Sequence, residues 1–409
     1  MRILVYPHSM QLGGSQLNAI QLAGAVRDRG HEVSVMAEPG PLVDRVRELG
    51  LEHVAIPAWR RRPSPHVLTR LMRLVRDQRI DIVHGHEWPP VLEAFLGPGV
   101  LRRTPVLGTV MSMSVVPFLP RCVPLVVGTE QIRDAALAAG HRHVSVIEPP
   151  VDTDADHPAL DGGPFRRDHG IAPDEVLLAM VCRLVPELKL EGVLAACDAT
   201  GELATSGRRV RLAIVGDGPA REQVQARASQ VNARLGRRAI VLTGATDQPG
   251  PAYAAADIVI GQGGSALRGM AFGKPLMVVG EHGFSDLLTP DSAPPFLRTG
   301  WFGLGPGSRG AGAGALRRGL EPVVDSPASR RELGAYARAL VVGRFGLGRA
   351  ARLQEEAYAA AIATPVGARG RTLEAARCSA GVIAAQLRRK AQRRRGTIHV
   401  DDANAHPVR

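Results

Sequence analysis

One stretch of the sequence, GQGGSALRGMAFGKPLMVVGE at 261–281, has residue types that can hold an anion. Gly263 and Gly264 predict a tight turn after an apolar strand, and Ser265 predicts the start of a helix. The free N–H groups and the dipole of a helix start favour negative charge. We therefore expect Gly263, Gly264 and Ser265 to bind a phosphate through their backbone N–H groups.

Two charged residues accompany this predicted phosphate site. Arg268 lies on the first turns of the predicted helix, where it either turns toward the phosphates as a further cation or pairs with a nearby acid. Glu281 follows the apolar strand PLMVV, so we expect its carboxylate in the same cleft, as the partner of Arg268 and as a ligand-binding group. The alternative is that both are ordinary solvated residues.

Two cations follow another apolar strand, in VCRLVPELKLEG. Arg183 and Lys189 bracket a proline-containing turn there. A planar guanidinium and a compact ammonium together suit a diphosphate. Only three of the 51 basic residues are Lys, so a retained Lys indicates a position where the larger guanidinium does not fit. The alternative interpretation is a pair of surface charges on a loop.

The N-terminal half has a second glycine turn, directly after its first predicted strand. Gly13 and Gly14 predict a turn that lets the backbone approach a ligand. Ser15 is expected to cap the following helix, whose start again favours an anion. A plain tight turn is the alternative.

Three polar residues end another strand, in DIVHGHEWPP. His84, His86 and Glu87 lie at that strand end, which is where ligands of doubly wound sheets bind. A metal would need a further well-placed ligand that the sequence does not offer, so we predict a site without metal.

The net charge of +12 is concentrated near the C terminus. Residues 366–409 carry ten basic and three acidic residues, and the densest run is RRKAQRRR, Arg388 to Arg395. Such a run is either a solvated tail or a contact with an anionic membrane surface. Aromatic residues make up only 4% of the chain, which leaves few platforms for stacking bases, so we expect no nucleic-acid partner.

The composition fits a globular protein with an ample core, since 45% of residues are hydrophobic and the mean hydropathy is −0.02. No apolar run approaches the about 18 residues of a membrane-spanning helix, and MRILVYPHSM predicts a first strand rather than a signal peptide. The cysteines have no metal-ligand spacing and are expected to be reduced thiols; they are Cys122, Cys182, Cys197 and Cys378. We therefore expect a cytoplasmic protein, peripheral to a membrane if the basic run binds one.

Short apolar runs that predict strands alternate with helix-like stretches in two series. The first series is ILVY, VSVM, DIVH, PVLGTV, PLVVGT and VSVIEPP, and the second is VLLAMVCR, RLAIVG, AIVLTG, DIVIG and PLMVVG. A Gly-, Asp- and Pro-rich interval, Asp152 to Pro164, separates the series. Alternating strands and helices predict parallel α/β sheets with crossover helices. We predict two doubly wound Rossmann-like domains, 1–155 and 160–345, then C-terminal helices at 346–395 and a disordered tail at 396–409.

Glycine and proline also indicate the structure of the last third. Their frequency between Pro290 and Gly314 predicts a loop-rich stretch. A helical region is expected to break near Gly343–Gly348, and a further helix is expected over Thr372–Arg395.

Six motifs in this order, over residues 1–345, resemble the glycosyltransferases with the GT-B fold, most closely family 4. They are GGSQ, RIDIVHGHE, VIEPPVDTDADHP, CRLVPELK, AIVGDGP and YAAADIVI. The resemblance implies two Rossmann-like domains facing a cleft, the N-terminal one on the acceptor side and the C-terminal one binding a nucleotide sugar. It also implies that His86 lies near the donor sugar and that Arg183 and Lys189 clamp the diphosphate.

The resemblance fails at the glycine-rich stretch. Family 4 has a longer loop there with Glu-x7-Glu, whereas this chain has a shorter loop and neither Glu. The stretch looks more like that of the bacterial peptidoglycan N-acetylglucosaminyltransferase, which also has a ribose-binding carboxylate where Arg268 stands.

We therefore expect transfer of a sugar from a nucleotide-diphosphate sugar to an acceptor, without metal or other cofactor. Stabilising the leaving diphosphate is the main catalytic demand, so His86, Arg183 and Lys189 are the expected catalytic residues. The family 4 resemblance implies retention of configuration. The acceptor is expected to be a sugar, a lipid-linked glycan or a natural product, and the Arg- and Ala-rich, Lys-poor composition indicates a bacterial source. Two alternatives are a catalytically silent binding protein of the same fold and a sugar-nucleotide epimerase.

Overall fold

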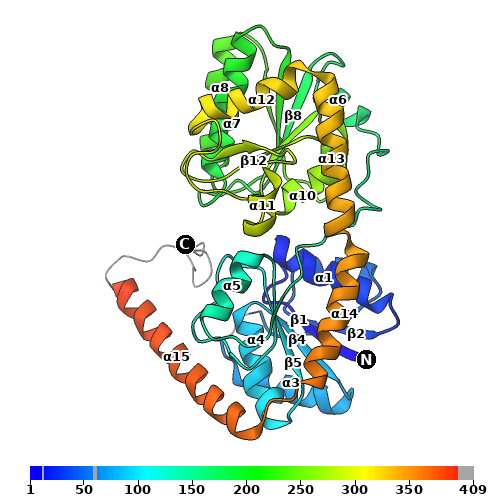
Figure 1. Ribbon diagram of the computed structural model, residues 1–409, viewed down its shortest axis with the longest axis vertical. Helices are drawn as coiled ribbons and strands as arrows, with labels where there is room; N and C mark the ends of the chain where they lie inside the picture. The colour runs from blue at the N-terminus through cyan, green and yellow to red at the C-terminus, as the bar shows by residue number, and fades with distance from the viewer. Residues whose placement is uncertain (12, 59–61, 395–409) are drawn as a thin grey trace. The chain divides into compact units, whose positions relative to one another are not determined.

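The computed structural model describes residues 1–11, 13–58 and 62–394 (Figure 1). The chain forms two compact units, Met1–Pro150 with Leu347–Arg409, and Val151–Gly346. The C-terminal helices, which the sequence presents as a separate segment, therefore belong to the first unit. The predicted disordered tail at 396–409 lies outside the described residues.

The first unit contains a seven-stranded parallel sheet in the order β3-β2-β1-β4-β5-β6-β7. Its strands are β1 (Arg2–Tyr6), β2 (Glu32–Ala37), β3 (Glu52–Ala55), β4 (Ile82–His86), β5 (Val106–Val110), β6 (Leu125–Val127) and β7 (Val144–Val146). The helices between them are α1 (Gly14–Arg27), α2 (Leu42–Glu48), α3 (Pro65–Asp77), α4 (Trp88–Ala94), the π-helix η1 (Phe95–Gly99) and α5 (Glu130–Ala138).

The strands of the first unit are short apolar runs because both faces of the sheet are covered. In β1, Ile3 and Val5 pack with α1 and α2, whereas Leu4 and Tyr6 pack with α3 and α4 on the other face. Strand β3 was not among the predicted strands, because only Val54 of its four residues is buried.

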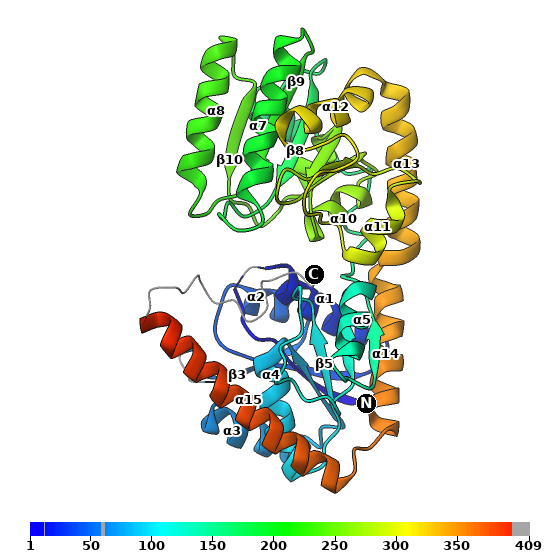
Figure 2. The same ribbon diagram turned by 60° about the vertical axis from the view of Figure 1, so that its left-hand side comes forward.

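Two C-terminal helices complete the first unit. α14 (Leu347–Ala363) places Tyr358 in the core with α1, and α15 (Ala368–Arg394) places Cys378 and Val382 in the core with α3 and α4. The two helices therefore cover opposite faces of the sheet (Figures 1 and 2). The predicted helix break is present at Gly346, between α13 and α14.

The second unit contains a six-stranded sheet in the order β10-β9-β8-β11-β12-β13, parallel except for β13. Its strands are β8 (Val176–Val181), β9 (Val210–Val215), β10 (Ile240–Gly244), β11 (Ile258–Gly261), β12 (Leu276–Val279) and β13 (Ser285–Leu287). Its helices are α6 (Gly163–Asp168), α7 (Leu190–Thr205), α8 (Arg221–Leu235), α9 (Gly250–Ala255), α10 (Gly264–Ala271), α11 (Ala293–Thr299), α12 (Gly312–Asp325) and α13 (Pro327–Phe345).

Helices cover both faces of the second sheet as well. α7, α8 and α12 pack on one face, and α9, α10 and α13 on the other (Figure 2). Helix α11 lies inside the stretch predicted as loop-rich, because its two prolines stand in the first turn, where proline suits a helix. The prediction of two Rossmann-like α/β domains is confirmed.

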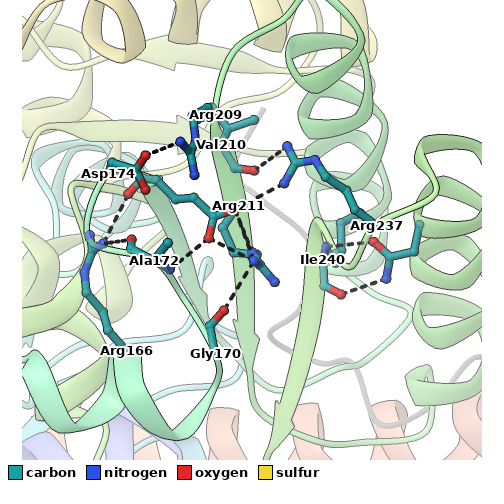
Figure 3. Close-up of polar contacts among 11 residues, drawn as sticks. Arg166, Gly170, Ala172, Asp174, Arg209, Val210, Arg211, Arg237 and Ile240 are labelled. Atoms are coloured by element: carbon teal, nitrogen blue, oxygen red, sulfur yellow. Dashed lines mark hydrogen bonds and ion pairs between the residues drawn. The ribbon is translucent and has the colours of Figure 1, made fainter.

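An ion-pair network ties together the amino ends of β8 and β9 (Figure 3). Glu175 is 6% exposed and accepts hydrogen bonds from Arg211 at 2.8 Å, from the Ala172 N–H at 2.9 Å and from Arg237 at 3.2 Å. Arg166 donates to the Glu175 carbonyl and pairs with Asp257 at 2.6 Å. The network stabilises the sheet at the amino ends of its strands, whereas the candidate site lies at their carboxyl ends.

Candidate active site

The strand order gives each sheet one switch point, at which consecutive crossovers leave in opposite directions. It lies between β1 and β4 in the first sheet and between β8 and β11 in the second. Ligands of doubly wound sheets bind beside the carboxyl ends of the strands at such a point. The predicted residues follow these four strands: Gly13 after β1, His86 at the end of β4, Lys189 after β8 and Gly263 after β11.

A small pocket at the switch point of the second unit brings Lys189 and Ser265 together. Lys189 is the N-cap residue of α7, and Ser265 lies in the first turn of α10. The lining residues are Met180, Val181, Cys182, Lys189, Val193, Ile260, Gly261, Gln262, Ser265 and Val279. Two of the predicted phosphate ligands therefore share one pocket.

Burial strongly perturbs the Lys189 ammonium. It lowers the pKa of Lys189 from 10.5 to about 8; nearby Cys182 opposes this shift and the charge of Arg183 adds to it. A desolvated ammonium gains much from an anion placed beside it. Lys189 is therefore suited to hold a phosphate.

Arg183 stands at the same strand end but differs from Lys189. Its side chain is exposed, it does not line the pocket, and it makes no ion pair with any of the described residues. It is close enough to lower the pKa of Lys189. The guanidinium is thus a cation at the rim, free to move onto a bound anion.

At the start of α10, one predicted phosphate ligand, the N–H of Gly263, is wrong. The N–H of Gly263 donates to the Trp301 carbonyl at 2.8 Å, so it is not available to a phosphate as we expected. Gly263 has φ 56° and ψ −132°, a conformation that favours glycine. The N–H groups of Gly264 and Ser265 precede the first intrahelical bond, from Leu267 to Gly263, and have no acceptor among the described residues.

The expected pairing of Arg268 with Glu281 is wrong. Arg268 makes a bidentate ion pair with Asp156, both contacts at 2.6 Å, and its guanidinium lies 5.7 Å from the ring centre of Tyr253. Asp156 lies in the segment before α6, in the motif VIEPPVDTDADHP, which gives no indication of this ion pair. Arg268 is also not a third phosphate cation, because its carboxylate partner neutralises it.

Glu281 contacts the backbone instead. Its Oε1 accepts a hydrogen bond at 3.0 Å from the N–H of Leu188, which has a positive φ of 62°. Gln262 donates from Nε2 to the carbonyl of the same residue at 2.6 Å. These two contacts hold Leu188 in a strained conformation and so fix the backbone directly before Lys189.

The glycine turn of the first unit is open at its surface. Gly13 has extended backbone and precedes α1. Gly14 is exposed, and no atom of the described residues other than its chain neighbours and its own helix backbone lies within 4 Å of the position of its β-carbon. The expectation that Ser15 caps α1 is wrong, because the helix already starts at Gly14 and the Ser15 hydroxyl donates to Glu87 Oε1 at 3.1 Å.

Glu87 links this turn to the loop after β5. Its carboxylate also accepts hydrogen bonds from the Met111 N–H at 3.0 Å and the Ser112 hydroxyl at 2.7 Å. Burial raises the pKa of Glu87, although these hydrogen bonds oppose the shift. Its φ of 66° and ψ of 168° are rare for any residue but glycine, and such strain is common at functional sites.

The two histidines of β4 are buried and neutral. His84 contacts the Tyr358 hydroxyl through Nδ1 at 2.8 Å and Thr109 Oγ1 through Nε2 at 2.7 Å. The ring centres of His84 and His86 are 4.1 Å apart. Burial, followed by the charge of nearby His8, lowers the pKa of His86 to about 3. His86 is thus a neutral hydrogen-bonding group beside the glycine turn of its unit.

The sequence offers no signal for several of these contacts. Asp156 and Tyr358 are distant in sequence from their partners, and Gln262 stands in a glycine-rich run that indicates no role for its side chain. Among the described residues, no group of three or more His, Cys, Asp or Glu side chains is arranged to hold a metal. In the same part of the chain, no helix combines the length and apolar character needed to cross a bilayer.

Comparison with known protein families matches both units. Residues 12–155 match the model described as Glycosyltransferase Family 4, and residues 175–318 match that described as Glycosyl transferases group 1. No curated protein is similar enough in sequence to be matched.

Solved structures are similar in fold over most of the chain. A glycosyltransferase from Rickettsia africae has a TM-score of 0.72 at 17% identity, covering 88% of this chain and 98% of that one. Anabaena HepE in complex with UDP-glucose has a TM-score of 0.68 at 16% identity, covering 88% and 100%. WaaG, a glycosyltransferase involved in lipopolysaccharide biosynthesis, has a TM-score of 0.57 at 15% identity, covering 86% and 99%.

The resemblance expected from the motifs is therefore confirmed by matches to both units and by the fold. The chain belongs to the glycosyltransferases with the GT-B fold, with a family 4 N-terminal half and a group 1 C-terminal half.

Proposed function

We propose that the chain transfers a sugar from a nucleotide-diphosphate sugar to an acceptor hydroxyl. The observation that carries this proposal is the partly buried Lys189 side chain, which shares one pocket with the first turn of α10 and whose pKa desolvation lowers. A desolvated cation beside free helix N–H groups stabilises the negative charge of a leaving diphosphate. The UDP-glucose bound by the HepE structure supports the same class of donor.

Each side chain at the second switch point has a role in this proposal. Lys189 binds the diphosphate as a point charge, and Arg183 closes on it from the rim as a fork. The N–H groups of Gly264 and Ser265 bind the remaining phosphate oxygens. The positive charge that develops on the donor sugar is balanced by the leaving diphosphate itself.

The first unit supplies the acceptor side. The open surface at Gly14 admits a ligand close to the backbone, and Glu87 fixes the turn through Ser15. With its pKa near 3, His86 stays neutral at physiological pH and is a hydrogen-bond partner for a sugar hydroxyl rather than an acid.

We further propose that the reaction needs no metal and retains the anomeric configuration. Two cations and a helix start can carry the diphosphate charge without a metal ion. Retention is supported by the match of residues 12–155 to family 4. Turnover should persist in EDTA, and NMR of the product should show the anomeric configuration of the donor.

The test of the proposal is calorimetric binding of a panel of nucleotide-diphosphate sugars, followed by turnover with candidate acceptors. Lys189→Ala is expected to reduce turnover about a hundredfold or more, the scale of losing one charge-stabilising donor. Lys274→Ala is a matched control, since Lys274 donates to the Ala254 carbonyl and does not line the pocket. Equal turnover of Lys189→Ala and wild type would contradict the proposal.

The same panel separates the two alternative functions. A catalytically silent binding protein would bind a donor and transfer nothing to any acceptor. A sugar-nucleotide epimerase would convert the donor alone, so new sugar-nucleotide signals would appear by NMR without acceptor.

We also propose an anionic membrane surface as a partner, which suits a lipid-linked acceptor. α15 leaves Leu373, Ile383 and Leu387 exposed, at 73%, 58% and 62%, on the side away from the core contacts of Cys378 and Val382. The basic run from Arg388 follows on the same helix, although Arg395 lies outside the described residues. Apolar side chains beside cations are typical of helices that lie in a bilayer interface.

Co-sedimentation with vesicles of neutral and anionic lipid tests this partner. The double change Ile383→Ser with Leu387→Ser should reduce binding to anionic vesicles, and high salt should reduce it in the wild type. Leu101→Ser is the control, because Leu101 is 70% exposed but lies outside α15. No binding of the intact protein to anionic vesicles at low salt would refute the proposal.

A further inference from the structure

One buried hydrogen-bond acceptor in the candidate site has no partner. Gln262 is 6% exposed, and its Nε2 donates to the Leu188 carbonyl at 2.6 Å. A carbonyl oxygen only accepts, so this contact fixes which end of the amide is the NH2 group. The other end, Oε1, is buried and makes no hydrogen bond with any of the described residues. A buried acceptor without a partner is costly and uncommon in native structures.

Gln262 lies in the candidate phosphate pocket, and its neighbours hold its side chain in place. Gln262 lines the same pocket as Lys189 and Ser265, directly before the start of α10. Its backbone is fixed by Ser265, whose hydroxyl donates to the Gln262 carbonyl at 3.0 Å. Its side chain is fixed by Leu188, which Glu281 holds from the N–H side. The amide is therefore held rigidly before any ligand binds.

The chemistry of the pocket limits what can satisfy Gln262. The Lys189 ammonium and the N–H groups of α10 are donors, and they suit the oxygens of a diphosphate. A phosphodiester-type oxygen has no proton to donate, so the Gln262 oxygen needs a different part of the ligand. In a nucleotide-diphosphate sugar, the groups that carry a proton next to the diphosphate are the hydroxyls of the ribose and of the transferred sugar.

We infer that Gln262 is a specificity-determining residue whose amide oxygen accepts a hydrogen bond from a hydroxyl of the nucleotide-diphosphate sugar beside the diphosphate. This inference rests on the proposed function. Gln262 then selects ligands that present a hydroxyl at this point, because a ligand without it leaves the acceptor buried and unmatched.

The test is calorimetric binding of three ligands to Gln262→Met: the nucleotide-diphosphate sugar selected from the panel, its nucleoside diphosphate, and inorganic pyrophosphate. Met keeps the side-chain length and removes both amide groups. Affinity for the nucleotide sugar should fall about ten- to a hundredfold, the effect of one lost hydrogen bond to a polar ligand group. Pyrophosphate, which has no hydroxyl group on carbon, should bind both proteins equally.

The two other ligands identify the hydroxyl. A loss that extends to the nucleoside diphosphate assigns it to the ribose, and a loss confined to the nucleotide sugar assigns it to the transferred sugar. Gln354→Met is a matched control, because Gln354 is a fully buried glutamine of the first unit whose amide atoms also lack partners. It should bind all three ligands as the wild type does.

The wild-type protein gives a second arm that does not depend on the variant folding. The ligands of this arm are analogues of the nucleotide-diphosphate sugar that each lack one hydroxyl of the ribose or of the transferred sugar. One of them should bind the wild type about ten- to a hundredfold more weakly than the complete nucleotide sugar does. This difference in affinity should vanish in Gln262→Met. Equal affinity of Gln262→Met and wild type for the nucleotide sugar would overturn the inference alone. Binding of pyrophosphate but of no nucleotide sugar by the wild type would overturn the proposed function as well.

Discussion

Removing the partly buried charge of Lys189 should stabilise the protein while it weakens donor binding. The pKa of Lys189 is lowered from 10.5 to about 8, a difference that corresponds to a cost of about 3 kcal/mol for the charged form at neutral pH. Lys189→Met removes this cost, so we expect the free energy of unfolding at pH 7 to rise by about 1–3 kcal/mol. Because the unfolded chain keeps the higher pKa, wild-type stability should rise between about pH 8 and pH 10.5, and the advantage of the variant should fade there.

The same pKa links donor binding to proton uptake. At pH 9 the free Lys189 is mostly neutral, and a bound diphosphate restores its charge, so each binding event should take up nearly one proton. At pH 7 the side chain is already mostly charged, and uptake should be small. Calorimetry at pH 9 in buffers of different ionisation enthalpy measures the number of protons directly.

The scarcity of lysine makes the pKa itself measurable. Lys189, Lys274 and Lys390 are the three lysines of the chain, so lysine labelled with carbon-13 at the ε position should give three NMR signals to titrate. Lys274→Arg and Lys390→Arg assign them and are controls that should keep the proton uptake. A Lys189 signal that titrates near pH 10.5, or binding at pH 9 without proton uptake, would refute the reasoning.

Further substitutions test interactions within the second unit by denaturant unfolding. Gly263→Ala should destabilise the second unit by about 1–3 kcal/mol because of its positive φ, whereas Gly264→Ala, with open space at the β-carbon position, should change stability by about 0.5 kcal/mol or less. Glu175→Gln should lower the free energy of unfolding by about 1–3 kcal/mol at pH 7. Burial raises the pKa of Glu175, but its hydrogen bonds and the arginine charges lower it overall. The contribution of Glu175 to stability is therefore present above about pH 4.5, and the stabilities of variant and wild type should converge as the pH falls through the lowered native pKa. Asp156→Asn should cost about 1–3 kcal/mol, most of it absent when Arg268→Gln is already in place, as a double-mutant cycle measures.

The alternation of apolar runs was sufficient to predict both sheets, because each buried parallel strand is a local apolar segment. Strand β3 escaped prediction since a single buried residue, Val54, gives no pattern. Strand β13 escaped because it is short and antiparallel at the sheet edge, where only Ser285 is buried. The membership of α14 and α15 in the first unit also lay beyond the sequence, since it depends on contacts over more than two hundred positions.

The sequence predicted the site residues that are placed by the strand before them. It did not predict contacts with residues that are distant in the sequence. Lys189 and Ser265 meet in one pocket because the segments that follow β8 and β11 carry them at the same switch point, and that order is visible in the sequence. Arg268 and Glu281 were assigned to each other because Glu281 follows a strand end that was expected to face the same cleft as Arg268. Their actual partners, Asp156 and the Leu188 backbone, lie in the motifs VIEPPVDTDADHP and CRLVPELK, but nothing in those motifs indicates these pairings.

The positions of the Asp156 and Glu281 carboxylates determine the charge of the candidate site in the second unit. Asp156 pairs with Arg268 and so neutralises a cation that was expected in the candidate site. Glu281 accepts a hydrogen bond from the Leu188 N–H, and the lining residues of the pocket include no acidic counter-ion for Lys189. The pocket therefore combines the Lys189 ammonium, the N–H groups at the start of α10 and the rigid Gln262 amide oxygen, and none of these has a hydrogen-bond partner among the described residues. That distribution of charge favours a ligand with a diphosphate at its centre and a hydroxyl at one side, and it disfavours a neutral sugar bound alone.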